Sequence, residues 1–162
     1  MTQFHARTVA FIGLGLISGS LARALRASSW SGSLTAWGPR EASLQRGLEL
    51  DVIDHYSLDI SEVLAAADMV IVGAPPAATG EMLRTVVDAL TSLNRSPTVT
   101  DLASIKGHVV DAMAHDYPNF VPGHPIAGSE HTGVAFADAA LFRGREVSLT
   151  PLPHTASDAT DQ

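Results

Sequence analysis

A glycine-rich turn near the amino terminus constrains the fold more than any other feature of the sequence. The apolar run Thr8–Gly13 leads directly into LGLISG, and an Ala-, Leu- and Arg-rich stretch of helical composition follows. In this context Gly13 permits a tight turn, and Gly15 lets the backbone approach a pyrophosphate at the start of the helix. Ser18 stands where a third glycine usually stands, and it is small enough for close helix–strand packing. A strand, a glycine turn and a helix in this order favour a dinucleotide-binding fold over a glycine turn without a ligand.

Short apolar runs alternate with helical patterns along the rest of the chain. The predicted strands are 8–13, 34–37, 69–75, 98–102, 119–123 and 146–150. The predicted helices are 20–26, 41–50, 61–67, 79–93 and 104–115. Two of the strands are nearly continuous in apolar residues, which is typical of strands covered by helices on both faces. We therefore expect an α/β fold with a Rossmann-type, doubly wound, mostly parallel sheet, in a single domain over residues 1–151.

The segment after the second predicted strand bears on the choice of cofactor. An NAD-selective domain usually has Asp or Glu at this strand end, where the carboxylate accepts a hydrogen bond from the ribose 2′-hydroxyl. Here Gly38 occupies that position, and Arg40 lies just beyond it. Without a carboxylate a 2′-phosphate is not repelled, and a guanidinium can pair with that phosphate bidentately. The pattern favours NADP over NAD; a plain Gly-Pro turn with a solvated arginine is the alternative.

Other strand ends supply further candidates, because ligands collect at the carboxyl ends of the strands in an open α/β sheet. We expect cofactor contacts from Leu16 and Ile17 beside the glycine turn, and from Ala74 and Pro75 at the end of the third predicted strand. Ser104, in TDLASIKG, follows the fourth predicted strand. Its hydroxyl can cap the next helix, donate a hydrogen bond to a substrate hydroxyl, or do both.

His124, in VPGHPIAGSE, is the strongest candidate for a catalytic group. Imidazole titrates near neutrality, so it can accept a proton while a hydride leaves the same carbon atom. Pro125 restricts His124 to extended backbone geometry and so directs its side chain. The remaining histidines lie in polar or helical settings, their spacing does not suggest metal ligation, and most are expected at the surface.

Composition and charge narrow the range of partners. The formal net charge of −7 argues against a general nucleic-acid-binding protein, which needs a basic face, and it means that an anionic substrate needs local cations. No run is long and apolar enough to span a bilayer. The sequence contains no cysteine, which excludes thiol catalysis and is compatible with a cytoplasmic location. We expect a small-molecule substrate, with neither nucleic acid nor a membrane as a partner.

Four motifs together carry a specific resemblance. They are GLGLISGSLARAL, LELDVID, TDLASIKG and GHPIAGSEHTGVAFADAALFRGREVSLTP, and in this order they resemble the nucleotide-binding domain of the prephenate dehydrogenase family. That family includes arogenate and cyclohexadienyl dehydrogenases, and the resemblance extends over about Thr8–Pro151. It implies an NAD- or NADP-dependent oxidoreductase of tyrosine biosynthesis, which oxidatively decarboxylates prephenate or arogenate.

The resemblance also implies roles for particular residues. His124 corresponds to the catalytic histidine, which accepts the proton of the ring C4 hydroxyl. Ser104 corresponds to a serine that contacts the same hydroxyl and the cofactor. Ser129 and Glu130 correspond to a small hydroxyl residue near the substrate and an acidic residue at the mouth of the site. The chain departs from the NAD-using members at Gly38, where they have Asp.

Length is the largest departure from the family. Its enzymes continue into an all-helical domain, which forms the homodimer, closes the cleft and supplies an arginine for the substrate carboxylate. We expect this chain to lack that domain and to be the cofactor-binding half, with a homodimer only where the helical domain is present. Residues 152–162 are expected to be a polar tail that begins the connection, with a frayed terminus as the alternative. Two other functions stay open: a reductase of the β-hydroxyacid dehydrogenase type, and a non-catalytic NAD(P)-binding module.

Overall fold

A six-stranded parallel sheet organises the computed structural model, which describes residues 4–113 and 117–161. Its strands are β1 (Thr8–Ile12), β2 (Ser33–Trp37), β3 (His55–Tyr56), β4 (Met69–Val72), β5 (Thr98–Asp101) and β6 (Phe120–Val121). They lie in the order β3-β2-β1-β4-β5-β6. The order reverses between β1 and β4, and at such a point the strand ends open onto a crevice. The expected Rossmann-type, doubly wound sheet is confirmed.

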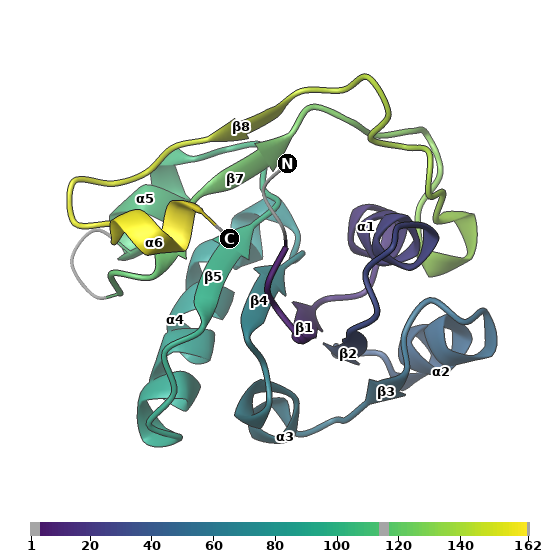
Figure 1. Cartoon of the computed structure of the whole chain (residues 1–162), viewed down its shortest axis with the longest axis horizontal. Coiled ribbons are helices and arrows are strands. Elements are labelled where there is room, and N and C mark those ends of the chain that lie inside the picture. Colours follow the sequence, from purple (N-terminus) through teal and green to yellow (C-terminus); the bar gives the residue numbers. More distant parts are fainter. Residues whose placement is uncertain (1–3, 114–116, 162) are drawn as a thin grey trace.

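Helices cover both faces of the sheet (Figure 1). On one face lie α1 (Leu16–Ala27), α2 (Glu41–Glu49) and the 3-10 turn η1 (Val134–Phe136). On the other lie α3 (Ile60–Ala65), α4 (Pro76–Ser92) and α5 (Gly107–Met113). Successive side chains of a strand point to opposite faces, so Val9 and Phe11 enter one core while Ala10 and Ile12 enter the other. Because both faces of β1 are covered, the strand is apolar from Val9 to Ile12.

The last two predicted strands are arranged differently from the expectation. The run 119–123 divides into β6 and β7 (Gly123–Pro125), because the buried Pro122 between them has no N–H to donate to a ladder. The run 146–150 contains β8 (Val147–Leu149), which pairs antiparallel with β7 in a separate two-stranded sheet. In Figure 1 this hairpin passes above the main sheet, from the side of α5 and α6 towards α1. The two-residue β3 was not predicted.

Several helix boundaries also differ from the prediction. The helix α1 begins at Leu16 rather than at residue 20, so it starts directly after the glycine turn. The helix α5 begins at Gly107, and therefore Ser104 does not cap it; the predicted residues 114 and 115 lie outside the described residues. In α2 the buried face passes through Leu44 and Gly47, while Leu48 is 42% exposed.

The carboxyl-terminal residues fold back onto the domain. Thr155 Oγ1 donates a hydrogen bond to the carbonyl of Phe120 in β6 (2.9 Å), and Ala159 of the short helix α6 (Ser157–Thr160) is buried. Among the described residues, no helix has both the length and the apolar character needed to cross a membrane.

An ion pair with pH-dependent consequences joins α1 to the sheet. The Asp54 carboxylate accepts a hydrogen bond from the backbone N–H of Leu34 (2.7 Å) and pairs with Arg26 (2.7 Å). Burial acts to raise the pKa of Asp54, but the Leu34 N–H and the Arg26 guanidinium outweigh it and bring that pKa below its ordinary value of 3.8. A lowered pKa contributes stability that is present above the unfolded-state pKa and is lost as the pH falls through the folded-state value.

We expect Asp54→Asn to lower the free energy of unfolding at neutral pH and to flatten its decline in acid, below about pH 4. Urea unfolding followed by circular dichroism between pH 7 and pH 3 measures both quantities. Asp88→Asn, at an exposed position of α4, is the matched control. A variant with the same pH profile as the wild type would contradict the role assigned to Asp54.

Candidate functional site

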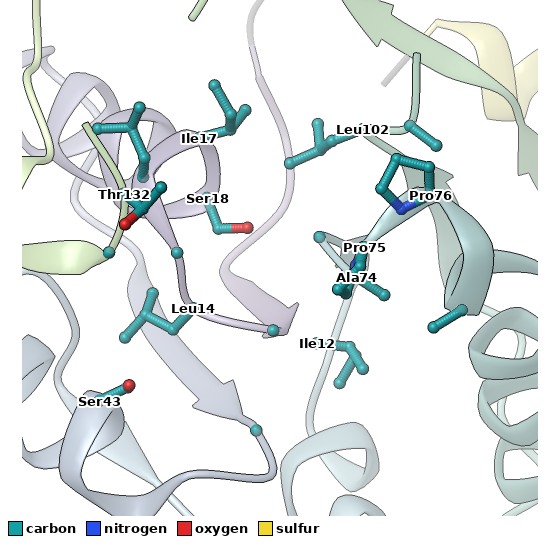
Figure 2. A pocket seen from close by; sticks show the side chains of 18 of the residues that line it. Ile12, Leu14, Ile17, Ser18, Ser43, Ala74, Pro75, Pro76, Leu102 and Thr132 are labelled. Carbon is teal, nitrogen blue, oxygen red and sulfur yellow. The ribbon is translucent and has the colours of Figure 1, made fainter. Parts of the chain in front are cut away.

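A cavity of about 890 Å³ lies at the carboxyl ends of the strands, and we call it the switch-point cavity. Its volume falls in the range of small-molecule and cofactor sites, about 300–1,000 Å³. Residues that follow β1, β2, β4 and β5 line it, together with residues of β7. In Figure 2, Ile17 and Ser18 of α1 lie on one side of the cavity, and Ala74, Pro75 and Leu102 lie on the other.

The glycine turn, Gly13–Gly15, has the geometry that a pyrophosphate requires. Gly13 has a φ of +96°, and a Cβ on it would lie 2.7 Å from the carbonyl oxygen of Gly73. At Gly15 an added Cβ would meet nothing within 4 Å, so the backbone there is open to the cavity. The helix α1 starts at the next residue with no side-chain cap and no acidic residue in its first turn. Its first N–H groups and its positive dipole end therefore suit an anion.

Ser18 takes the place of the third glycine, and its small size matters. A Cβ on Gly73 would collide with Ser18 Oγ, so α1 packs closely against the end of β4 at this point. Ser18 is only 2% exposed. The packing that the sequence predicts for a small residue at position 18 is therefore present.

A second part of the cavity wall follows β2. Gly38, Arg40 and Ser43 line it, and Arg40 directly precedes α2. Glu41 is the first residue of α2, but it is not among the lining residues, and its carboxylate accepts a hydrogen bond from the Tyr56 hydroxyl (3.1 Å). Among the described lining residues this wall therefore offers a guanidinium and a hydroxyl but no carboxylate. Sequence reasoning missed Ser43, although its place in the first turn of α2 was a usable signal.

The predicted proton acceptor lies on another wall of the same cavity. The half-buried His124 belongs to β7, where it pairs with Ser148 of β8, and the exposed Ser104 follows β5. Within the described part of the chain, neither the imidazole of His124 nor the hydroxyl of Ser104 has a hydrogen-bond partner. Both groups are therefore available to a ligand.

The turn after His124 only partly follows the expectation. Ser129 lines the cavity, and its hydroxyl accepts a hydrogen bond from the backbone N–H of His131 (3.2 Å). Glu130 is exposed and is not a lining residue; its carboxylate lies 3.7 Å from His131 Nε2. His131, which the sequence did not single out, lines the cavity and stacks on Phe136 with ring centroids 4.7 Å apart. Its closeness to GHPIAGSE was the only signal for it.

Cationic groups are scarce around His124. The basic residues among the described lining residues are Arg40, His124 and His131. Lys106, the cation nearest to Ser104 in sequence, forms an ion pair with the buried Asp101. Across residues 4–113 and 117–161, no group of three or more His, Cys, Asp or Glu side chains could hold a metal ion. The described cavity therefore has the features of a nucleotide site and has no lysine or arginine beside His124.

The remaining predicted cofactor residues also line the switch-point cavity. They are Leu16, Ile17, Ala74 and Pro75. Residues that the sequence did not predict include Trp37, Pro76, Met82, Leu102 and Thr132. These are mostly apolar and lie in separate places, namely β2, α4 and the loops after β5 and β7, so neither their type nor their spacing marks them in the sequence.

The strand order, the glycine turn and the cavity at the switch point define a Rossmann-type nucleotide-binding domain. A family model described as "Prephenate dehydrogenase, nucleotide-binding domain" matches residues 21–162. The chain therefore belongs to the prephenate dehydrogenase family, an assignment that supersedes the β-hydroxyacid dehydrogenase alternative.

Curated relatives and solved structures agree with this assignment. The cyclohexadienyl dehydrogenase of Zymomonas mobilis is 33% identical over 161 residues, and the prephenate dehydrogenase of Bacillus subtilis is 32% identical over 158 residues. These matches cover 98% and 96% of this chain but 53% and 42% of the two relatives, so the chain spans about half their length. The crystal structure of Aquifex aeolicus prephenate dehydrogenase in complex with hydroxyphenyl propionate and NAD+ is 30% identical, with a TM-score of 0.86 over 97% of this chain and 55% of that one.

Substitutions of Gly13 and Gly15 are expected to have different effects. We expect Gly13→Ala to lower the free energy of unfolding by about 2 kcal/mol or more, because its positive φ and the Gly73 carbonyl exclude a Cβ.

We expect Gly15→Val to leave stability nearly unchanged but to weaken NADPH binding by about tenfold or more, because its side chain enters the open space at the start of α1. Chemical denaturation and NADPH fluorescence titration measure the two effects. Equal NADPH affinity in Gly15→Val and the wild type would contradict this placement of the pyrophosphate.

Proposed function

We propose that this chain is the nucleotide-binding half of an enzyme that oxidatively decarboxylates prephenate or arogenate. The observation that carries the proposal is that one cavity joins the glycine turn to Ser104 and His124. A hydride acceptor and a proton acceptor can therefore meet at one substrate carbon. The Aquifex aeolicus relative, whose crystal structure is described as a complex with hydroxyphenyl propionate and NAD+, supports the same type of ligand pair.

The roles of the residues follow from the chemistry of the substrate. Bound NAD(P)+ supplies the hydride acceptor. Ser104 forms a hydrogen bond to the ring C4 hydroxyl and orients it, and His124 accepts the hydroxyl proton as the C4–H bond breaks and a C4 carbonyl forms. Cleavage of the bond between C1 and its carboxylate then releases CO2. The electron pair of that bond moves through the ring to the C4 oxygen, which takes back the proton held by His124 and becomes a phenol hydroxyl. Formation of the aromatic ring drives the reaction forward.

We propose that the rest of the enzyme supplies the cation for the substrate carboxylate and the homodimer interface. Two observations support this division. Lys106 forms an ion pair with Asp101, and the described lining beside His124 contains no lysine or arginine. The chain also spans only about half the length of its curated relatives. On this account the isolated chain binds the cofactor and turns over substrate very slowly; rapid turnover by the chain alone would contradict it.

We propose NADP(H) as the preferred cofactor. Arg40 and Ser43 can bind a 2′-phosphate, and Gly38 provides no carboxylate that would repel it. Glu41, which directly follows Arg40 in sequence, accepts a hydrogen bond from the Tyr56 hydroxyl and does not line the cavity. A Cβ on Gly38 would make only an ordinary contact with Leu44 (3.5 Å), so a Cβ at this position does not disturb α2.

Cofactor preference is tested by two substitutions. We expect Arg40→Ala to weaken NADPH binding by about tenfold and to leave NADH binding nearly unchanged, because only NADPH carries the 2′-phosphate. We expect Gly38→Asp to reverse the preference in favour of NADH, because the carboxylate repels the phosphate and accepts from the ribose hydroxyl. Fluorescence titration with both cofactors measures the change, with Arg84→Ala, at an exposed position of α4, as the control. Tighter binding of NADH than of NADPH by the wild-type chain would overturn the proposal.

The role of His124 is tested in a chimaera in which this chain continues into the carboxyl-terminal half of the Zymomonas mobilis relative. We expect His124→Asn to lower kcat by about 10²–10⁴-fold, with nearly unchanged cofactor affinity, because a general base is lost while the glycine turn is untouched. His108→Asn is the matched control, since that histidine is exposed on α5 and does not line the cavity. Equal turnover in the wild type and His124→Asn would contradict the assignment, and an inactive wild-type chimaera would favour the non-catalytic module.

A further inference from the structure

The carboxylate of Asp101, at the end of β5, lies between the two segments that carry Ser104 and His124. It is wholly buried, at 0% exposure. One of its oxygens, Oδ2, accepts hydrogen bonds from the backbone N–H of Ala103 (3.0 Å) and from Lys106 Nζ. The other, Oδ1, accepts from the backbone N–H of Gly123 (3.2 Å). Each oxygen therefore holds a different segment of the chain.

The first segment is the loop that presents Ser104. Ala103 and Lys106, both bound to Oδ2, are on either side of Ser104 in sequence, so the loop is held at two points. The side chain of Lys106 is only 20% exposed, and its ammonium group compensates the buried carboxylate. Because a buried charge is tolerated only when it is paired and hydrogen-bonded, this ion pair and the loop conformation depend on each other.

The second segment is β7, which presents His124. Gly123 directly precedes His124, and a Cβ on Gly123 would lie 2.8 Å from both the backbone oxygen of Asp101 and Thr100 Oγ1. The start of β7 is thus pressed against the end of β5, and the hydrogen bond to Asp101 Oδ1 fixes where it lies. Pairing with β8 and the following Pro125 then fix how His124 leaves this point.

We propose that Asp101 is a positioning residue, whose single carboxylate sets the placement of Ser104 relative to His124. The inference extends the proposed function, on which it rests, because that reaction requires both side chains to reach one substrate hydroxyl. The placement is demanding, since a misplacement of about 1 Å can cost about a hundredfold in rate. Asp101 acts through these two residues and does not itself line the cavity.

The substitution Asp101→Asn is expected to keep the hydrogen bonds to one of the two segments and to remove those to the other. An asparagine has one acceptor oxygen and one amino group, whereas the three groups around Asp101 are all donors. With its oxygen towards Gly123, the amino group faces Ala103 and Lys106; the reverse orientation places it against the Gly123 N–H. Either orientation leaves one segment without its acceptor. We therefore expect the distance between Ser104 and His124 to change.

Nuclear magnetic resonance of the whole chain tests this expectation without requiring turnover. We expect Asp101→Asn to shift the backbone resonances of Ser104 and the imidazole resonances of His124. Asp68→Asn is the matched control, because Asp68 also accepts two backbone N–H groups, those of Arg7 and Thr8 (2.9 and 3.0 Å), at the amino-terminal end of β1. Imidazole and Ser104 shifts no larger than those of the control overturn the proposal.

A second measurement decides the matter if Asp101→Asn does not fold. In the wild-type chain the Gly123 amide should exchange with solvent at least about a hundredfold more slowly than an open amide, because its N–H is held by a buried carboxylate. Exchange at the rate of an open amide overturns the proposal. Failure of the wild-type chain to bind either NADPH or NADH contradicts the proposed function instead, and leaves these resonance and exchange measurements able to decide the role of Asp101.

Discussion

The close approach of the chain at the ends of β1 and β4 is the constraint on which the rest of the site depends. The N–H of Gly13 donates to the carbonyl of Trp37 (2.8 Å), and the N–H of Gly73 donates to the carbonyl of Ile12 (2.8 Å). Both ladders therefore continue beyond the strands into the turn. The chain can leave β1 at this point only because Gly13 adopts a positive φ against the Gly73 carbonyl. The start of α1 follows from that turn, and so does the open space above Gly15.

The His124 segment reaches the same cavity by a different route. After the turn at Ser129 the chain returns to α1, where η1 packs against Gly19 and the Ser20 hydroxyl accepts from the backbone N–H of Asp138 (2.9 Å). The helix that begins at the glycine turn thus also supports the segment that follows His124. Asp101 holds the preceding residue from the side of β5. The cavity is therefore enclosed by segments that are more than a hundred residues apart but are fixed to common elements.

The sequence predicts the centre of the main sheet well because β1 and β4 are nearly continuous in apolar residues and the helices carry apolar stripes. In α4, for example, Leu83, Val86 and Leu90 are buried as the spacing predicts. Most of the site residues that it predicts line the cavity, because glycines at a strand end and a histidine before a proline have few other reasons to occur there. The roles of His124, Ser104 and Arg40 stay predictions, because their placement in one cavity does not measure what they bind.

Other features depend on tertiary contacts that leave no local signal. The two-residue β3 exists because His55 and Tyr56 pair with β2, although their own sequence is polar. His131 is exposed, as expected for most of the other histidines, but its place beside the cavity depends on the turn after Ser129. In the sequence Asp101 is only part of the motif around Ser104, because a contact with Gly123, 22 residues away, cannot be seen from sequence spacing. In α2, Leu44 and Leu48 are four residues apart, but spacing alone could not show that the buried face passes through Gly47 while Leu48 is exposed.

The central claim is that the switch-point cavity binds a dinucleotide with its reactive ring beside His124. A crystal structure of this chain with NADP+ tests the claim most directly. The account predicts the pyrophosphate at the start of α1 above Gly15, the 2′-phosphate beside Arg40 and Ser43, and the nicotinamide ring within contact distance of His124. A dinucleotide bound outside this cavity, or bound in it with the nicotinamide ring turned away from His124, would contradict the account.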